Sequence, residues 1–192
     1  MSVLCVFVRS TIASATVAAA LVANGGIDFT PSVGERTLEG IKFPELYFHE
    51  NGRKISYEQP RGWSYSGDAG HIKFVPPDAR QAFGEISQAA LPQPQNFDEE
   101  TMKSLQAKAL AFLSPDAGDV SVSTQKNPLM INQHETFEVI IAYHVYGEQY
   151  QQSVLFMNLP DTQVTFRFVA RQSDFDKLHR AFRGSLCSLQ WL

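Results

Sequence analysis

The sequence predicts an α+β fold in which a helix packs on an antiparallel sheet. Three strand-like segments follow one another closely, at residues 137–146, 150–156 and 164–170, and connections this short favour antiparallel neighbours. An amphipathic helix then begins near Ser173, with apolar residues at three- and four-residue steps. These observations indicate a sheet with one face covered by the C-terminal helix.

The first half of the chain adds shorter strands. Asn51 and Gly52 separate two strand-like runs, and this pair is a strong hairpin signal because both turn residues must adopt positive φ. Pro44 indicates that the first run is an edge strand or begins irregularly. Further strands are expected at residues 71–75 and 82–87.

Two helices are expected. The first spans about residues 98–113, where Asp98 can cap the helix and apolar residues recur at helical spacing. Ser114 and the proline after it end this helix. In the second helix, Ser173 is the expected N-cap, with Asp176 three positions on.

One face of the strand at residues 137–146 is expected to be core. Its alternate residues are apolar, whereas a solvated face would be polar. Ile140 and Ala142 on the other face suggest a central strand that is covered on both sides. The residues of the core face are Phe137, Val139, Ile141, Tyr143 and Val145.

Composition indicates a globular protein and excludes some partners. The 192 residues are 44% hydrophobic, and the net charge is −4. An acidic chain without a basic stripe lacks the electrostatic footprint of nucleic-acid binding, so no nucleic-acid partner is expected. The two cysteines, Cys5 and Cys187, lie near opposite ends. Cys187 is expected to be a small, unreactive core residue of the last helix.

The front of the chain is similar to a secretory signal peptide. Residues 11–23 carry no charge, follow Arg9 and contain small residues suited to cleavage. The stretch is too short and alanine-rich for a membrane span, which needs about 20 mostly apolar residues. We therefore expect a secreted or periplasmic protein with no stable membrane span after cleavage, the alternative being a buried alanine-rich helix.

The expected organisation has three parts. Residues 1–24 are the signal-peptide-like segment, and residues 25–40, which contain a proline and several glycines, are expected to be a flexible lead-in. A single domain is expected over residues 41–192.

No residue pattern predicts catalysis, a metal or a cofactor. The five histidines are scattered, and the segment from His134 to Glu138 lacks the second histidine of the zinc-binding pattern H-E-x-x-H. No glycine-rich phosphate-binding motif occurs. Ser64 lies in a segment that resembles a nucleophile elbow, but Ser66 stands where that motif requires glycine.

Aromatic residues are the remaining lead for a binding surface. Tyr143 and Tyr146 close one strand and Tyr150 opens the next, which would place three tyrosines at one end of the sheet. Such a cluster can bind a ligand or a partner, although cross-strand pairing for stability is the commoner use. His144 and Trp63 complete the candidate surface, and Trp63 is also expected to close one end of the core.

The order of elements resembles the PsbP-like superfamily. The resemblance covers about residues 53–190 and rests on the segment K-I-S-Y-E-Q-P-R-G-W at residues 54–63, the helix near 98–113, the long meander and the terminal segment D-F-D-K-L-H-R-A-F at residues 174–182. The superfamily includes the photosystem subunit PsbP, Mog-type Ran-binding proteins and bacterial proteins of unknown role.

The resemblance implies an α/β/α sandwich, a central antiparallel sheet flanked by helices. It supplies no catalytic residues, because members mostly act as accessory or binding proteins. The acidic chain lacks a basic patch for docking on a photosystem, and nothing in it matches a Ran-binding surface. The specific partners of those relatives are therefore not transferred.

The leading functional hypothesis is a non-catalytic accessory protein that contacts a protein partner in the cell envelope. One alternative is a carrier of a small molecule or lipid, with an apolar pocket at the tyrosine end of the sheet. Others are a hydrolase using Ser64, His71 and a nearby carboxylate, or a chaperone for secreted effectors. The sequence does not indicate an oligomeric state.

Overall fold

The computed structural model describes residues 26–192, so the predicted signal-like segment, residues 1–24, lies outside the described residues. Residues 26–192 form eleven strands and two helices. None of the helices in the described part is long and apolar enough to cross a membrane. The elements are β1 (Ile27–Leu38), β2 (Ile41–Glu50), β3 (Arg53–Tyr57), β4 (Ser64–Gly67), β5 (His71–Val75), β6 (Phe83–Ala90), α1 (Glu99–Leu110), β7 (Gly118–Lys126), β8 (Thr136–Val145), β9 (Glu148–Asn158), β10 (Thr162–Arg171), α2 (Gln172–Leu186) and β11 (Gln190–Trp191).

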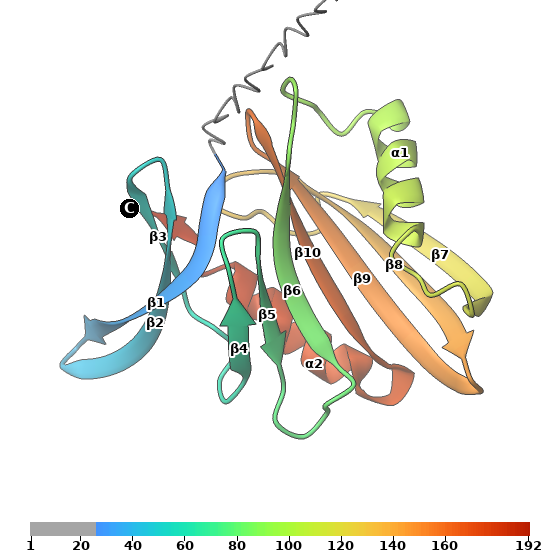
Figure 1. Ribbon diagram of the computed structural model, residues 1–192, viewed down its shortest axis with the longest axis horizontal. Helices are drawn as coiled ribbons and strands as arrows, with labels where there is room; N and C mark the ends of the chain where they lie inside the picture. Colours follow the sequence, from blue (N-terminus) through green and yellow to red (C-terminus); the bar gives the residue numbers. More distant parts are fainter. Residues whose placement is uncertain (1–25) are drawn as a thin grey trace, which may run out of the picture.

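The strands form two antiparallel sheets (Figure 1). The larger has seven strands in the order β4-β5-β6-β10-β9-β8-β7, and the smaller has four in the order β1-β2-β3-β11. The predicted meander is confirmed as β8, β9 and β10, which pair as neighbours inside the larger sheet. The fold is therefore mostly β, with antiparallel sheets and two helices.

Each face of the larger sheet has its own apolar core. α1 covers β8 and β9 on one face, where Leu105 and Ala109 of the helix pack with the predicted core face of β8. On the other face, α2 and the smaller sheet share one layer, and Phe175, Phe182 and Leu186 of α2 are buried there. A second sheet thus lies beside α2.

Both helices form where they are expected, but only α1 is capped as predicted. The Asp98 carboxylate accepts a hydrogen bond from the backbone N–H of Thr101 at 2.8 Å, which satisfies one free amide of the first turn. The prediction of Ser173 as N-cap of α2 is wrong. Arg171 holds that position without a side-chain cap, because β10 runs directly into the helix.

Residues 27–38 form β1, whereas a flexible lead-in is expected there from the sequence. Ile27 and Phe29 are 3% and 1% exposed and belong to the core between the sheets. Gln88 of β6 accepts a hydrogen bond from the backbone N–H of Ile27 at 2.7 Å. β1 also pairs with β2, so Pro44 lies opposite Glu35 in an inner strand, and its placement at an edge is wrong.

The predicted hairpin turn at Asn51 and Gly52 and the predicted core position of Trp63 are confirmed. Asn51 and Gly52 have φ values of 49° and 80° and join β2 to β3. Gly62 has a φ of 78°, which turns the chain so that Trp63 enters the core. The indole is 6% exposed and stacks on Phe182 with ring centroids 6.4 Å apart.

Gly84 of β6 is a point of close approach between sheet and helix. A Cβ atom there would lie 2.5 Å from a ring carbon of Phe182, and that ring is fixed by its neighbours in the aromatic core. We expect Gly84→Ala to lower the free energy of unfolding by about 2 kcal/mol through overpacking, measured by urea denaturation.

The matched control is Gly184→Ala in α2. A Cβ at Gly184 meets nothing within 4 Å, and alanine is favoured over glycine in a helix by up to about 1 kcal/mol. Equal changes in the free energy of unfolding for Gly84→Ala and Gly184→Ala would contradict the close approach of Gly84 to the Phe182 ring.

Candidate functional site

The three tyrosines of the predicted surface do not share one environment. Tyr143 and Tyr150 stack across β8 and β9 with centroids 5.9 Å apart, and Tyr143 is only 8% exposed in the α1 core. Tyr146 lies in the turn between these strands, is 86% exposed and donates a hydrogen bond to Asp116 at 2.6 Å. Tyr143 is therefore part of the core, and the half-buried Tyr150 packs against it.

The other two residues of the predicted surface lie elsewhere. Trp63 is buried on the opposite face of the sheet from Tyr143. His144 is half-buried, and its Nδ1 lies 3.5 Å from the Asp119 carboxylate. The five residues of the predicted surface thus do not come together. Within residues 26–192, no group of three His, Cys, Asp or Glu residues is placed to hold a metal ion.

The geometry separates the residues of the hydrolase alternative. Ser64 pairs with Val75, whereas His71 begins β5 four residues earlier, which places the two about 13 Å apart along the strand. His71 Nδ1 does contact Asp68 at 3.1 Å, but Ser64 is out of reach of this pair.

Cys187 is exposed, so the prediction of a core cysteine is wrong. α2 ends at Leu186, and Cys187 is its C-cap residue. The side chain therefore does not follow the buried stripe of the helix.

The core between the two sheets has no room for a lipid. Its void, lined by Phe29, Phe48, Phe166 and other apolar side chains, measures about 10 Å³, space for a single water at most. The lining of this void includes none of Tyr143, Tyr146 and Tyr150, the end of the sheet at which the carrier alternative expects its pocket.

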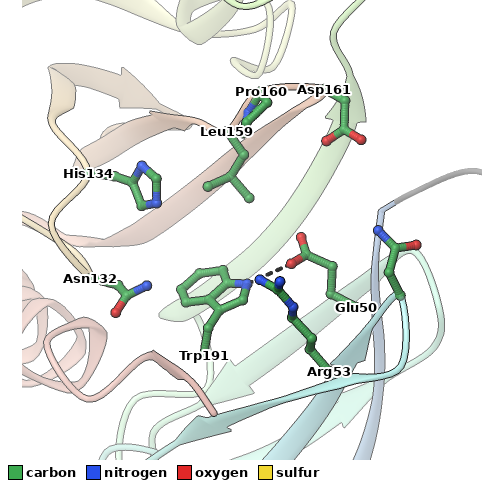
Figure 2. A pocket seen from close by; sticks show the side chains of 9 residues that line it. Glu50, Arg53, Asn132, His134, Leu159, Pro160, Asp161 and Trp191 are labelled. Carbon is green, nitrogen blue, oxygen red and sulfur yellow. Dashed lines mark hydrogen bonds between the residues drawn. The ribbon is translucent and has the colours of Figure 1, made fainter.

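A larger, polar pocket of about 410 Å³ lies at one end of the two sheets (Figure 2). Four segments far apart in the sequence supply its side chains: the β2–β3 turn, the loop before β8, the β9–β10 turn and β11. We call it the Trp191 pocket. It is lined by Glu50, Asn51, Arg53, Asn132, His134, Leu159, Pro160, Asp161 and Trp191.

Trp191 is held in place by three contacts. β11 pairs with β3 and sets Trp191 opposite Ile55. The indole Nε1–H donates a hydrogen bond to Glu50 Oε2 at 2.8 Å. The His134 ring lies edge-on to the indole at 6.4 Å between centroids. The indole therefore presents a fixed aromatic surface within the pocket (Figure 2).

Tight turns hold the polar residues around this indole. Asn132 and Gln133 have φ values of 45° and 68°, and Ile131 and His134 exchange both backbone hydrogen bonds, at 3.1 and 2.8 Å. Two successive non-glycine residues at positive φ are uncommon and persist where the surrounding structure fixes them. The turn thus positions His134 and Asn132.

The pocket combines opposite charges that are not neutralised by one another. Glu50 is engaged by Trp191, but Arg53 and Asp161 have no ion pair within residues 26–192. The lining includes no serine, threonine, cysteine or lysine that could act as a nucleophile. An aromatic surface with one unpaired cation and one unpaired carboxylate is suited to binding a polar group.

A second set of ionisable groups is buried beneath α2. The Glu138 carboxylate, 1% exposed, accepts a hydrogen bond from Ser153 at 2.7 Å and lies 3.3 Å from both His179 Nε2 and Arg183 Nη1. Arg183 also donates to the Pro128 carbonyl at 2.6 Å. Burial favours a higher pKa for Glu138, but the hydrogen bonds from His179 and Ser153 and the charge of Arg183 outweigh it and lower the pKa. This network fastens α2 to the sheet.

Comparisons with solved structures give distant likenesses, and the sequence comparisons give none. No protein-family model matches the chain, and no curated protein sequence matches it. A crystal structure from Bacteroides thetaiotaomicron VPI-5482 is similar at 14% identity and a TM-score of 0.46, over 72% of this chain and 45% of that one. The chain thus spans less than half the length of that neighbour.

A second solved structure is a Pseudomonas aeruginosa protein of unknown function, PA94. It is 11% identical, with a TM-score of 0.46, over 82% of this chain and 96% of that one.

Sequence reasoning missed the Trp191 pocket because its parts are distant in the chain. Only the Asn51 and Gly52 turn left a local signal. Trp191 is the penultimate residue, and its pairing with β3 depends on the tertiary fold. β11 is only two residues long, which is too short to give a periodic pattern in the sequence.

Proposed function

We propose that the protein is a secreted or periplasmic, non-catalytic accessory protein that binds a protein partner through the Trp191 pocket. We also propose that it belongs to the PsbP-like superfamily as an α/β/α-type sandwich with an added sheet. The Trp191 pocket is the observation that carries the proposal, because it sets an aromatic surface held by Glu50 beside a cation, Arg53, and a carboxylate, Asp161, that form no ion pair within residues 26–192.

The chemistry of the pocket favours a protein partner. Tryptophan and arginine are enriched among the residues that dominate binding energy at protein interfaces, and Trp191 and Arg53 both line the pocket. A partner side chain or chain end can place an acidic group on Arg53 and a basic group on Asp161. The apolar part of that segment would then lie against Trp191.

The proposed compartment rests on the sequence. The uncharged segment at residues 11–23, with Arg9 before it, has the pattern of a secretory signal. The mass of the mature chain from the source cells tests this. Cleavage near residue 24 is the expected result, and an intact N-terminus would favour a chaperone that acts before secretion.

Site-directed photocrosslinking tests the pocket. A photoreactive residue at Asn51, on the pocket wall, is expected to give one discrete adduct in intact source cells, and excess unlabelled protein should compete for it. The same residue at Lys177, exposed on α2, is the matched control. Equal labelling from both positions, or no protein adduct from Asn51, would argue against a partner bound in the pocket.

The volume of the pocket favours a second candidate function, a carrier of a small polar molecule. About 410 Å³ lies within the range of small-molecule sites. Thermal unfolding against a panel of polar metabolites separates this function from the first, since a ligand at 100 times its Kd stabilises by about 2.7 kcal/mol.

A further inference from the structure

The larger sheet ends in a long exposed strand, β7 (Figure 1). All nine residues of β7 are exposed, including Val120 at 43% and Val122 at 37%. Within residues 26–192, β8 is its only neighbour in the sheet. An edge strand of this length, with apolar side chains and no proline, is a template for pairing with another strand.

The opposite edge of the larger sheet, formed by β4, offers less free backbone for pairing with another strand. β4 has only four residues, and the β1 strand lies beside the turn that follows it, where the Phe29 N–H donates to the Ala69 carbonyl at 3.4 Å. Head-to-tail addition of β7 to β4 of another copy would therefore find little backbone to pair with. Pairing of β7 with itself needs no second surface and closes after two subunits.

We propose that β7 pairs antiparallel with β7 of a second copy, on a two-fold axis through Ser123. The regular part of the strand sets this register. A register shift between Gly118 and Ser121 interrupts the pairing with β8 at one end, and Asn127, with a φ of 51°, turns the chain at the other. Ser121 to Lys126 lie between these points, and the axis is placed at Ser123, one of their two central residues.

This register is self-complementary. It sets Val122 opposite Thr124 of the second copy, and β-branched residues of this kind pack well across strands. Both lie on the α1 side of the sheet, because they pair with Ile141 and Val139 of the α1 core. The register also places Lys126 opposite Val120 and Asp119 opposite Asn127, so no like charges face each other.

Cysteine crosslinking and molar mass test the dimer in the full chain with Cys5 and Cys187 replaced by serine. Ser123→Cys is expected to give a disulfide-linked dimer under mild oxidation, and Ser66→Cys on β4 is the control that should stay monomeric. Light scattering of the protein without added cysteines should show a molar mass that doubles with concentration. Amide protection of residues 121–125 should rise in parallel.

Val122→Lys separates dimer formation from folding. The exposed valine contributes little to the monomer, so the variant should keep its unfolding midpoint while staying monomeric at every concentration. A monomeric mass for the native chain throughout, or a dimer that Val122→Lys leaves intact, would overturn the proposal. So would protection of β7 only when another protein is added, which would indicate an extended strand of a different partner.

Discussion

Phe168→Ala is expected to lower the free energy of unfolding by about 3–5 kcal/mol, the usual range for removing a buried phenylalanine. The ring is fully buried on β10. It lies 5.7 Å from Phe182, 5.6 Å from Phe175 and 6.2 Å from Trp63, measured between ring centroids. Alanine would leave a cavity where α2 meets the sheet. Urea denaturation measures the loss.

Phe168→Leu is the matched control for this cavity. It keeps most of the volume and is expected to lose less than half as much stability as the alanine variant. A loss of under 1 kcal/mol for Phe168→Ala would mean that the aromatic cluster is not the main anchor of α2.

Arg183→Met is expected to destabilise the protein by about 3 kcal/mol at neutral pH. The substitution removes the Arg183 cation and leaves the buried Glu138 carboxylate with the contacts from His179 and Ser153. Breaking a buried pair from one side costs about 3–5 kcal/mol. Arg183 is 29% exposed on its side chain, which places the expected value at the low end. Chemical denaturation at pH 7 measures it.

Replacing both partners gives the control for Arg183→Met. The double variant Glu138→Leu with Arg183→Met removes the charge as well as its partner. It is expected to recover most of the lost stability. A double variant as unstable as Arg183→Met alone would show that the cost lies in packing.

The pH dependence of stability follows from the same pair. The pKa of Glu138 lies below its ordinary value of 4.5 in the folded protein, so the folded state binds fewer protons than the unfolded state as the solution becomes acidic. The contribution of Glu138 is complete above this ordinary value and is lost as the pH falls through the lower folded pKa. Arg183→Met should therefore show a smaller loss of stability on acidification than the native protein.

The elements with strong local patterns are the ones that the sequence predicts well. The alternation in β8 and the helical spacing of α1 each depend on residues close together in the chain. β1 was missed because Pro31 and Gly34 dominate the composition of its segment, while Ile27 and Phe29 are the buried residues among those of β1 whose side chains are described. Their burial depends on β6 and the smaller sheet, which no local pattern encodes.

The candidate site was less predictable than the fold. Tyr143 and Tyr150 do pair across the strands, but Tyr143 is buried in the α1 core and Tyr150 is half-buried against it. Sequence position places Tyr146 beside them, and yet its positive φ of 51° puts it in the turn. The Trp191 pocket requires three turns and the last strand to meet, and such a meeting is a property of the tertiary structure alone.

We propose that the Trp191 pocket binds a protein partner, and the affinity of the isolated partner for pocket variants tests this most directly. Trp191→Ala and Arg53→Ala should each weaken binding at least tenfold, about 1.4 kcal/mol, with the folded state confirmed by thermal unfolding. Tyr146→Ala removes an exposed aromatic residue outside the pocket and should leave the affinity unchanged. Equal affinity for the native protein and both pocket variants would contradict the claim.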